Sequence, residues 1–407
     1  MSKTKTAVCR MLSAIAVLSI ICSCSPDKRG GMESLPPCAV TEGLDSLFSG
    51  IFPEEEGPGG IAMVMRNDTV VYRHAFGVAD LQSKEPINDS TLFNLSSASK
   101  IFTSAALLKL CEQGMLSLDD SLSKFFPEFN EEVFAPLTIR HILTHSSGLP
   151  DPRPANAKEW SKYQDMHHSV FVDNEDYALY GDEGEHMHSF QNLTRADFEP
   201  GTHYNRQDPA YILVAPIIEK VTGSTFEEWM DRNIFKPAGT KETFYYSYLS
   251  EMPPTSHAYR KADGRPASLA FRSEDGRWEE YDFGEAPFFL TRADRGVYSS
   301  ARDFMVWNRA LYSGKIISDS SLKVINMPYI PTDVPMVSFG LGTAIREEPG
   351  FPLKSYHMNS NGAYSIVEGT WPEEKLHYIV FANRADWDYR AVTASIDSIF
   401  KAKGFLK

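Results

Sequence analysis

The sequence predicts an α/β domain combined with an all-α part, in which an antiparallel sheet is flanked by helices and carries a helical insertion. Near the start of the chain, "GGIAMVMRNDTVVYRHAFGVADL" alternates apolar and polar residues as a β-hairpin does. Near its end, "AYSIVEGTW" and "LHYIVFANR" are two more strand patterns. Helices and long loops are expected between them, in residues 115–285. Strands from both ends of the chain are therefore expected to flank a helical middle.

Local signals place the elements in order. The hairpin starts near Gly60 and turns at an Asn-Asp pair, residue types that accept a positive φ. A helix is expected in "SARDFMVWNRALYSG", and a last one near residues 389–402. The sheet part then covers about 44–105 and 286–407, and the helical part about 106–285.

The stretch "FNLSSASKIFTSAALLKLCEQG" begins another helix at Ser97, and Gly114 supplies its C-terminal stop. Apolar residues recur there at helical steps of three and four: Ile101, Ala105, Leu108 and Cys111. Cys111 fits a small buried residue of this helix, and no cysteine pair or quartet has zinc spacing. We expect no metal and no cofactor.

The N-terminus has the pattern of a targeting segment. Basic residues precede the apolar run "MLSAIAVLSII", which is short for a membrane span. Residues Ile21 to Cys24 resemble a bacterial lipobox, which implies lipidation of Cys24. We expect a signal peptide over 1–23, a tether over 24–43, and a lipid-anchored protein of the cell envelope, on the periplasmic face or the cell surface. A plain signal peptide and a first helix of the fold are the alternatives.

The net charge of the chain argues against nucleic acid as a partner. Three of the 40 basic residues precede Cys24, which leaves 37 against 54 acidic residues, a net charge of −17. Such a chain repels nucleic acid and is not drawn to anionic lipid. The content of 42% hydrophobic and 12% aromatic residues is that of a globular protein.

Ser97 and Lys100 form an S-x-x-K pair that has two interpretations. Residues three apart on a helix share a face, so the lysine amine can lie within hydrogen-bond reach of the serine hydroxyl. A buried lysine has a lowered pKa and can then act as a base toward a serine nucleophile. Alternatively, Ser96 or Ser97 caps an ordinary helix and Lys100 is solvated, and the short motif alone favours that alternative.

The surrounding sequence favours catalysis. The chain resembles the penicillin-recognising serine hydrolases: class C β-lactamases, D-alanyl-D-alanine carboxypeptidases, and related esterases and acyltransferases. The resemblance is carried by "VVYRHAFGVADLQSKEPINDSTLFNLSSASK", "LTIRHILTHSSGLP", "PGTHYNRQDPAYILVAPIIEKVTG", "GVYSSARDFMVWNRALYSGKI" and "SFGLGTAI", in the family's order. It implies the β-lactamase/D,D-peptidase-like fold, Ser97 as the acylated nucleophile and Lys100 as its base.

Two family motifs are altered. Where the family has Tyr-x-Asn, this chain has Arg206, Gln207 and Asp208. An arginine is no base at neutral pH, and Asp208 facing Lys100 would keep that lysine protonated. Tyr204 matches a structural aromatic and Tyr211 a tyrosine of the next helix; neither is in register for the tyrosine's role.

The third motif, Lys-Thr-Gly or His-Thr-Gly on an edge strand, is here His357, Met358 and Asn359. The resemblance makes the backbone N–H groups of Ser97 and Ser360 the oxyanion hole, which needs no particular side chain. Asn359 puts a side chain where the family lets the substrate approach. We expect four residues to contact the substrate: Arg206, Asp208, His357 and Asn359.

Two other clusters have structural alternatives. His167, His168, His186 and His188 lie among carboxylates and suit a divalent ion, but a solvated loop over the site fits their composition better. His145 and Ser146 match a family segment that packs near the site, where a structural role is favoured.

These features predict an exported serine hydrolase that forms an acyl-enzyme with a small-molecule or peptide ester or amide, such as a cell-wall peptide, a β-lactam or a small ester. Under this hypothesis Lys100 takes the proton of the Ser97 hydroxyl, and Arg206 holds an anionic group of the substrate. Two alternatives stay open: an acyltransferase with an alcohol acceptor, and a non-catalytic envelope binding or sensor protein that keeps the fold.

Overall fold

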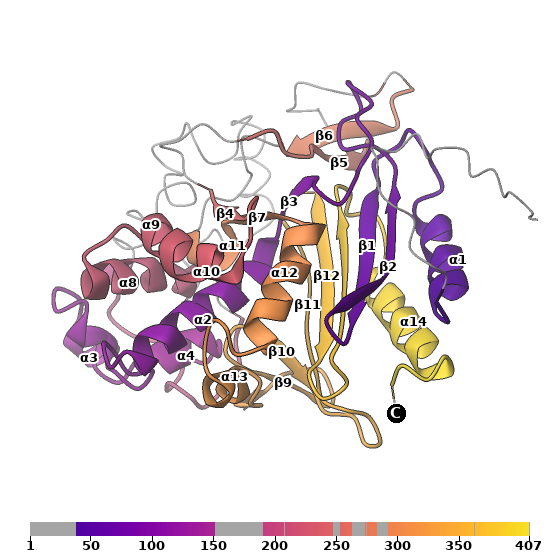
Figure 1. Ribbon diagram of the computed structural model, residues 1–407. Coiled ribbons are helices and arrows are strands. Elements are labelled where there is room, and N and C mark those ends of the chain that lie inside the picture. The colour runs from indigo at the N-terminus through magenta and orange to yellow at the C-terminus, as the bar shows by residue number, and fades with distance from the viewer. Residues whose placement is uncertain are drawn as a thin grey trace, which may run out of the picture.

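Figure 1 shows the computed structural model, which describes residues 38–150, 190–206, 208–246, 253–262, 273, 275–282, 292–361 and 363–406. Its centre is an eight-stranded antiparallel sheet with the strand order β2-β1-β13-β12-β11-β10-β9-β8. The strands are β1 Gly60–Arg66, β2 Thr69–Phe76, β8 Ile330–Pro331, β9 Val337–Phe339, β10 Ala344–Arg346, β11 Lys354–Asn361, β12 Tyr364–Trp371 and β13 Leu376–Ala382. The N-terminal hairpin thus pairs with the C-terminal strand β13, which confirms the expected antiparallel sheet.

The hairpin forms at the expected turn. Asn67 and Asp68 both have positive φ, 48° and 63°, the conformation that a two-residue hairpin of this kind requires. Both faces of β1 are buried: Ile61 packs with the core on one side of the sheet and Ala62 with the core on the other. Strands covered on both faces have near-continuous apolar sequences, as β1 and β13 do.

Helices cover both faces of the sheet (Figure 1). One face carries α1 Thr41–Ile51 and α14 Tyr389–Ala402, which pack against each other. The opposite face carries α2 Ser99–Glu112 and α12 Ala301–Tyr312, with α13 Asp319–Ile325 beside them. Both α12 and α14 lie where the sequence predicts helices. In the described stretches, every helix is too short or too polar to cross a membrane.

The middle of the chain is largely helical, as expected, but it also holds short strands. Its helical elements are η2 Leu122–Lys124, α3 Glu131–Phe134, α4 Ile139–Leu143, η3 Asp208–Leu213, α8 Val214–Thr222, α9 Phe226–Met230, the π-type turn η4 Asp231–Phe235 and α10 Lys236–Ala238. A small sheet joins β3 Leu92–Asn94, β7 Val297–Ser300 and β4 Phe244–Tyr245, and a hairpin joins β5 Ala258–Lys261 to β6 Trp278–Asp282. Strands of two to five residues are too short to show a periodicity.

Helix α2 differs from the expected helix with one apolar face. The chain first makes a 3-10 turn, η1 Ser96–Ala98, and the α-helix begins at Ser99. Apolar Ile101 and Ala105 are buried, but so are the polar residues Lys100 and Thr103 on other sides of the helix. Helix α2 is surrounded by the small sheet, the helical part and the large sheet. More of its side chains are therefore buried than the spacing of its apolar residues predicts.

Candidate active site

Ser97 lies in the turn between a strand and a helix. Strand β3 ends at Asn94, whose side-chain oxygen accepts the backbone N–H of Ser96 at 2.9 Å. Ser96 then adopts a φ of +48°, a left-handed conformation that serine seldom adopts and that often marks a functional turn. The turn places Ser97 one residue before α2, with the side chain facing the cluster described next.

Lys100 lies directly against the Ser97 hydroxyl. Its Nζ donates to Ser97 Oγ at 3.1 Å, and only 1% of its side chain is exposed. The same Nζ lies 2.9 Å from Asp208 Oδ1 and 3.9 Å from Asp294 Oδ2. Burial lowers the pKa of Lys100, while the two carboxylates act in the opposite direction. The pKa stays below the ordinary lysine value, which favours release of a proton.

Two arginines complete the charged cluster. Arg295 donates to Asp208 Oδ2 through Nη2 and to Asp294 Oδ2 through Nε, the latter at 3.1 Å. Arg206 Nε donates to Asp208 Oδ1 at 3.3 Å. Burial alone would raise the pKa of Asp208, but Lys100 and both arginines hold it well below its usual range. Three basic groups therefore face two carboxylates around the serine, which favours an added negative charge there.

A glycine lets a loop close over Lys100. Gly342 has a φ of +79°, and a Cβ there would lie 2.6 Å from Ser104 Oγ and 3.0 Å from the Lys100 carbonyl oxygen. A residue larger than glycine would have to push α2 away. The loop "SFGLGTAI" thus packs on the helix and keeps the lysine out of water.

Arg206 contacts the nucleophile candidate itself. Its Nη2 donates to Ser97 Oγ at 2.9 Å, and 45% of its side chain is exposed. Arg206 therefore lies between solvent and the serine. A guanidinium cannot accept the serine proton, but it stabilises a negative charge on that oxygen or on a nearby substrate group.

Two tyrosines near the cluster make structural contacts. Tyr211 places its ring 5.1 Å below the Lys100 ammonium, but its hydroxyl donates to the Leu143 carbonyl oxygen. Tyr204 packs on His145 and Phe339, and burial raises its pKa to about 12. Both positions agree with the structural roles expected from the sequence.

Asn359 reaches Ser97 from strand β11. Its Oδ1 accepts the backbone N–H of Ser97 at 3.1 Å. Since an N–H only donates, the amide atom that faces it is the oxygen. Asn359 is 6% exposed, and within the described residues its buried Nδ2 has no hydrogen-bond partner. The Asn359 side chain was expected to crowd the substrate. It contacts the Ser97 N–H, which is one of the two donors expected to form the oxyanion hole.

The other β11 candidates lie on either side of Asn359. His357 is buried and donates through Nε2 to the Gly342 carbonyl oxygen at 2.6 Å, while Nδ1 lies 2.6 Å from Glu368. Its ring therefore ties β11 to the loop that covers Lys100. Ser360 is exposed and pairs with Ser365 of β12. Strand β10 pairs only with residues 354–356 of β11, so within the described chain the stretch from His357 onward has a strand partner on one side.

Other candidates fall beside the cluster or outside the described residues. His145 is buried with Nε2 3.8 Å from Asp208 Oδ1, and the Ser146 hydroxyl bonds that of Thr144 at 2.8 Å, which agrees with structural roles. Cys24, Gln207 and the four histidines of residues 167–188 lie outside the described residues. Among the described residues, no group of three or more His, Cys, Asp or Glu side chains is placed to hold a metal.

Sequence reasoning missed Asp294 and Arg295. They form part of α11 Arg292–Arg295, a single turn just before β7, and reach the cluster from almost 200 positions after Ser97. No spacing rule connects them to Lys100. The one available signal was two adjacent charged residues before the family segment "GVYSS".

Comparison with known proteins gives one family. The family model described as Beta-lactamase matches residues 44–398. Penicillin-binding protein 4* of Bacillus subtilis is 27% identical over 84% of this chain and 72% of its own length. Esterase EstB of Burkholderia gladioli is 29% identical over 81% of this chain and 87% of its own length.

A solved structure has the same fold. The octameric penicillin-binding protein homologue from Pyrococcus abyssi superposes with a TM-score of 0.71 at 23% identity, covering 89% of this chain and 76% of that one. At this identity the likeness concerns the fold, which is the β-lactamase/D,D-peptidase fold predicted from the sequence.

Proposed function

We propose, for a chain that belongs to the Beta-lactamase family of serine hydrolases, that Ser97 forms an acyl-enzyme with an ester or amide substrate. The observation that carries the proposal is the 3.1 Å contact between Lys100 Nζ and Ser97 Oγ inside a buried, charged cluster. Burial supplies the lowered lysine pKa that a base needs near neutral pH.

In the proposed reaction, the neutral Lys100 amine takes the Ser97 proton as Oγ bonds to the substrate carbonyl carbon. The bond to the leaving group breaks, and the Lys100 proton passes to the leaving oxygen or nitrogen. Water then attacks the acyl carbon while Lys100 takes the water proton. The bond between the acyl carbon and Ser97 Oγ breaks, Lys100 returns the proton to Oγ, and the carboxylic acid leaves. The backbone N–H groups of Ser97 and Ser360 hold the oxyanion in both steps.

Arg206 takes a different part from the tyrosine it replaces. Its guanidinium lies 2.9 Å from Ser97 Oγ and is half exposed, which suits a cation that binds an anionic group of the substrate as it enters. Its charge also adds to that of Arg295 in lowering the pKa of Lys100. We therefore propose an ester or amide that carries a carboxylate or a similar anion. Transfer of the acyl group to an alcohol instead of water is the same chemistry with another acceptor.

A second candidate function is binding without catalysis. It is favoured by the two side chains that already occupy Ser97, Arg206 on its Oγ and Asn359 on its N–H. A protein of the envelope that keeps the fold as a sensor would tolerate both contacts.

Covalent labelling separates the two functions. Wild type and Ser97→Ala are incubated with a fluorophosphonate or a fluorescent penicillin, and the intact mass is measured. We expect one adduct on wild type and none on Ser97→Ala. Absence of an adduct from both proteins, under conditions that label a related esterase, would contradict the enzyme proposal and favour the sensor.

We also propose that Cys24 carries a lipid that anchors the protein to the cell envelope. Support comes from the lipobox-like residues before it, with aliphatic Ile21 at the third position before the cysteine and the small Ser23 directly before it. Expression of wild type and Cys24→Ser in a bacterial host, with a radiolabelled fatty acid, tests this. Label in the variant as strong as in wild type would rule out Cys24 as the acceptor.

A further inference from the structure

The oxyanion-hole donor on Ser97 is already occupied by the protein. Asn359 Oδ1 is a carbonyl oxygen of an amide, the same chemical species as the oxygen of a substrate amide, and it accepts the Ser97 N–H at 3.1 Å. An oxyanion hole works only when its donors point at the oxygen of the reacting carbonyl. In this arrangement the substrate carbonyl and the Asn359 carbonyl compete for one N–H.

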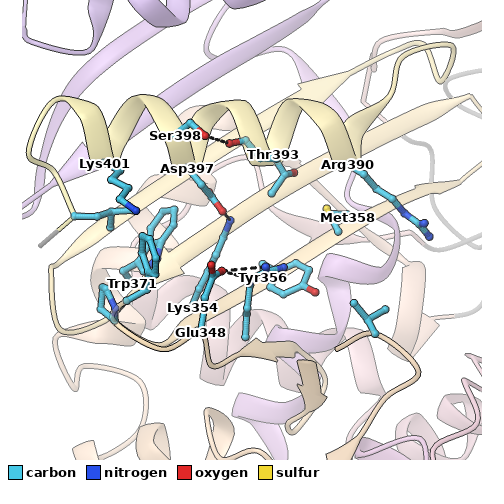
Figure 2. Close-up of a pocket in the computed structure, with 16 residues that line it drawn as sticks. Glu348, Lys354, Tyr356, Met358, Trp371, Arg390, Thr393, Asp397, Ser398 and Lys401 are labelled. Carbon is cyan, nitrogen blue, oxygen red and sulfur yellow. Dashed lines mark hydrogen bonds and ion pairs between the residues drawn. The ribbon is translucent and has the colours of Figure 1, made fainter. Parts of the chain in front are cut away.

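The position of Asn359 on its strand keeps the side chain in place. Side chains alternate along β11, and that of His357, two residues earlier, lies on the same face as Asn359 and is fixed by Gly342 and Glu368. The face toward Ser97 therefore receives the Asn359 amide whenever the strand is formed. Met358 lies between them and belongs to the opposite face, where it lines a cavity beside α14 (Figure 2).

The amide nitrogen gives Asn359 a reason to move. Within the described residues, Nδ2 is buried without a hydrogen-bond partner, and a buried donor that is left unpaired is destabilising. A substrate that offers an acceptor to Nδ2 while its own carbonyl takes the Ser97 N–H would satisfy both groups. A small ester without a second acceptor gains one hydrogen bond for the one it displaces and leaves Nδ2 unpaired.

We propose that Asn359 is a specificity-determining residue that gates the oxyanion hole and selects acyl donors with a second acceptor, an amide or carboxylate oxygen, near the scissile carbonyl. The inference rests on the proposed acyl-enzyme function and assigns a substrate class to that site. Binding energy from the second acceptor displaces the Asn359 oxygen, and small esters react slowly because they lack it.

The test compares two esters in wild type and Asn359→Ala. The esters are p-nitrophenyl acetate and the p-nitrophenyl ester of N-acetylglycine, whose amide is the second acceptor. We expect Asn359→Ala to speed the reaction of the acetate about 10-fold. This is less than the roughly 10²–10³-fold that one oxyanion donor is worth, because the acetate carbonyl competes with Asn359 for the N–H in wild type. The N-acetylglycine ester should gain less, so the preference for it should fall.

Two further variants sharpen the result. Asn359→Asp should slow the acetate, because a carboxylate accepts the Ser97 N–H more strongly than an amide does. Met358→Ala is the matched control on the same strand with its side chain on the other face, and it should leave the preference unchanged. A purely structural role for Asn359 predicts loss of thermal stability without any gain in rate.

Labelling by a fluorophosphonate separates failure of the gate from failure of the function. Ser97 Oγ would bond to phosphorus, fluoride would leave, and the serine proton would pass to Lys100. Faster labelling of Asn359→Ala than of wild type supports the gate. Equal rates overturn the gate and leave the acyl-enzyme proposal standing, whereas no adduct in either protein overturns both.

Discussion

Among the residues that the structure describes, two lysines are buried, and their surroundings differ. Lys100 lies in helix α2, 3.1 Å from the Ser97 hydroxyl. Lys354 lies on the opposite face of the sheet, at the wall of a cavity of about 520 Å³ between β11 and α14 (Figure 2). Their side chains are 1% and 4% exposed, and burial lowers the pKa of both.

Both lysines also have a carboxylate and a hydroxyl as neighbours. Lys354 Nζ lies 2.7 and 2.9 Å from the two oxygens of Asp397 and 3.2 Å from the Tyr378 hydroxyl, with its charge 4.6 Å from the Trp371 ring. A Cβ on Gly369 would lie 2.7 Å from the Lys354 side chain, so a glycine makes room for the pair.

The difference lies in the hydroxyl and in the extra charges. Burial raises the pKa of Tyr378 well above its usual value, and one carboxylate matches the one ammonium there. At Lys100 the hydroxyl belongs to a serine in the turn before a helix, and two arginines add positive charge. A buried lysine beside a hydroxyl is therefore a structural ion pair or a catalytic one, depending on whether a negative charge can develop on that oxygen.

The largest expected effect is on acylation. Lys100→Met should slow the reaction of Ser97 with a p-nitrophenyl ester by about 10³-fold, the range for loss of a general base. Lys354→Met should change that rate by less than about 3-fold, since it lies on the other face of the sheet. Stopped-flow release of p-nitrophenol measures both. An equal loss of acylation rate in the two variants would contradict a catalytic role for Lys100 that Lys354 does not share.

Stability should show the reverse contrast. Removing Lys354 leaves Asp397 facing a cavity without its partner, and breaking a buried ion pair costs 3–5 kcal/mol, reduced here to about 2–4 because Asp397 is 32% exposed. Lys100→Met should cost less, because Arg206 and Arg295 still neutralise Asp208. Urea unfolding followed by fluorescence gives both values. Partial recovery in Lys354→Met/Asp397→Leu would confirm that the unpaired carboxylate is the cause.

The pH dependence sharpens the role of Arg206. Acylation should rise with pH as Lys100 loses its proton, and the lowered pKa places that rise below the range of an ordinary lysine. Because the Arg206 charge lowers this pKa, Arg206→Gln should move the rise to higher pH. Rate profiles at constant ionic strength test the shift. A profile that moves to lower pH would contradict the assignment of Lys100 as the base.

The smallest expected effect comes from placing a tyrosine at position 206. Arg206→Tyr should raise turnover of a neutral ester by a few-fold, about 2–5, if a missing proton shuttle limits the rate. The same variant should lose binding of a substrate that carries a carboxylate, seen as a higher KM. A slower variant on both substrates would mean that Arg206 has a positive role in the chemistry itself.

Local patterns predicted the parts of the fold that are long and regular. The hairpin at Gly60, the strands β12 and β13 and the helices α12 and α14 all follow from periodicity and turn residues. The small sheet β3-β7-β4 did not, because its strands of two to four residues pair across distant segments. The burial of every side of α2 also depends on elements far away in the sequence.

The candidate site shows the same division. Ser97 and Lys100 are three positions apart, and a helix alone brings them together. Arg206 and Asp208 were placed by resemblance, whereas Asp294 and Arg295 carry no signal because their contact with Lys100 is purely tertiary. The position of Asn359 in the third motif predicted that its side chain would crowd the substrate position. Its hydrogen bond to the Ser97 N–H was not predicted, because it depends on a side-chain orientation that packing sets.

The experiment that tests most directly whether Ser97 is the nucleophile and Lys100 its base locates the covalent bond. Wild type and Lys100→Met are treated with a fluorophosphonate for equal short times, digested, and the modified peptide is sequenced by mass spectrometry. We expect one adduct, on Ser97, abundant in wild type and scarce in Lys100→Met. An adduct on another residue, or equal labelling of Ser97 in the two proteins, would contradict it.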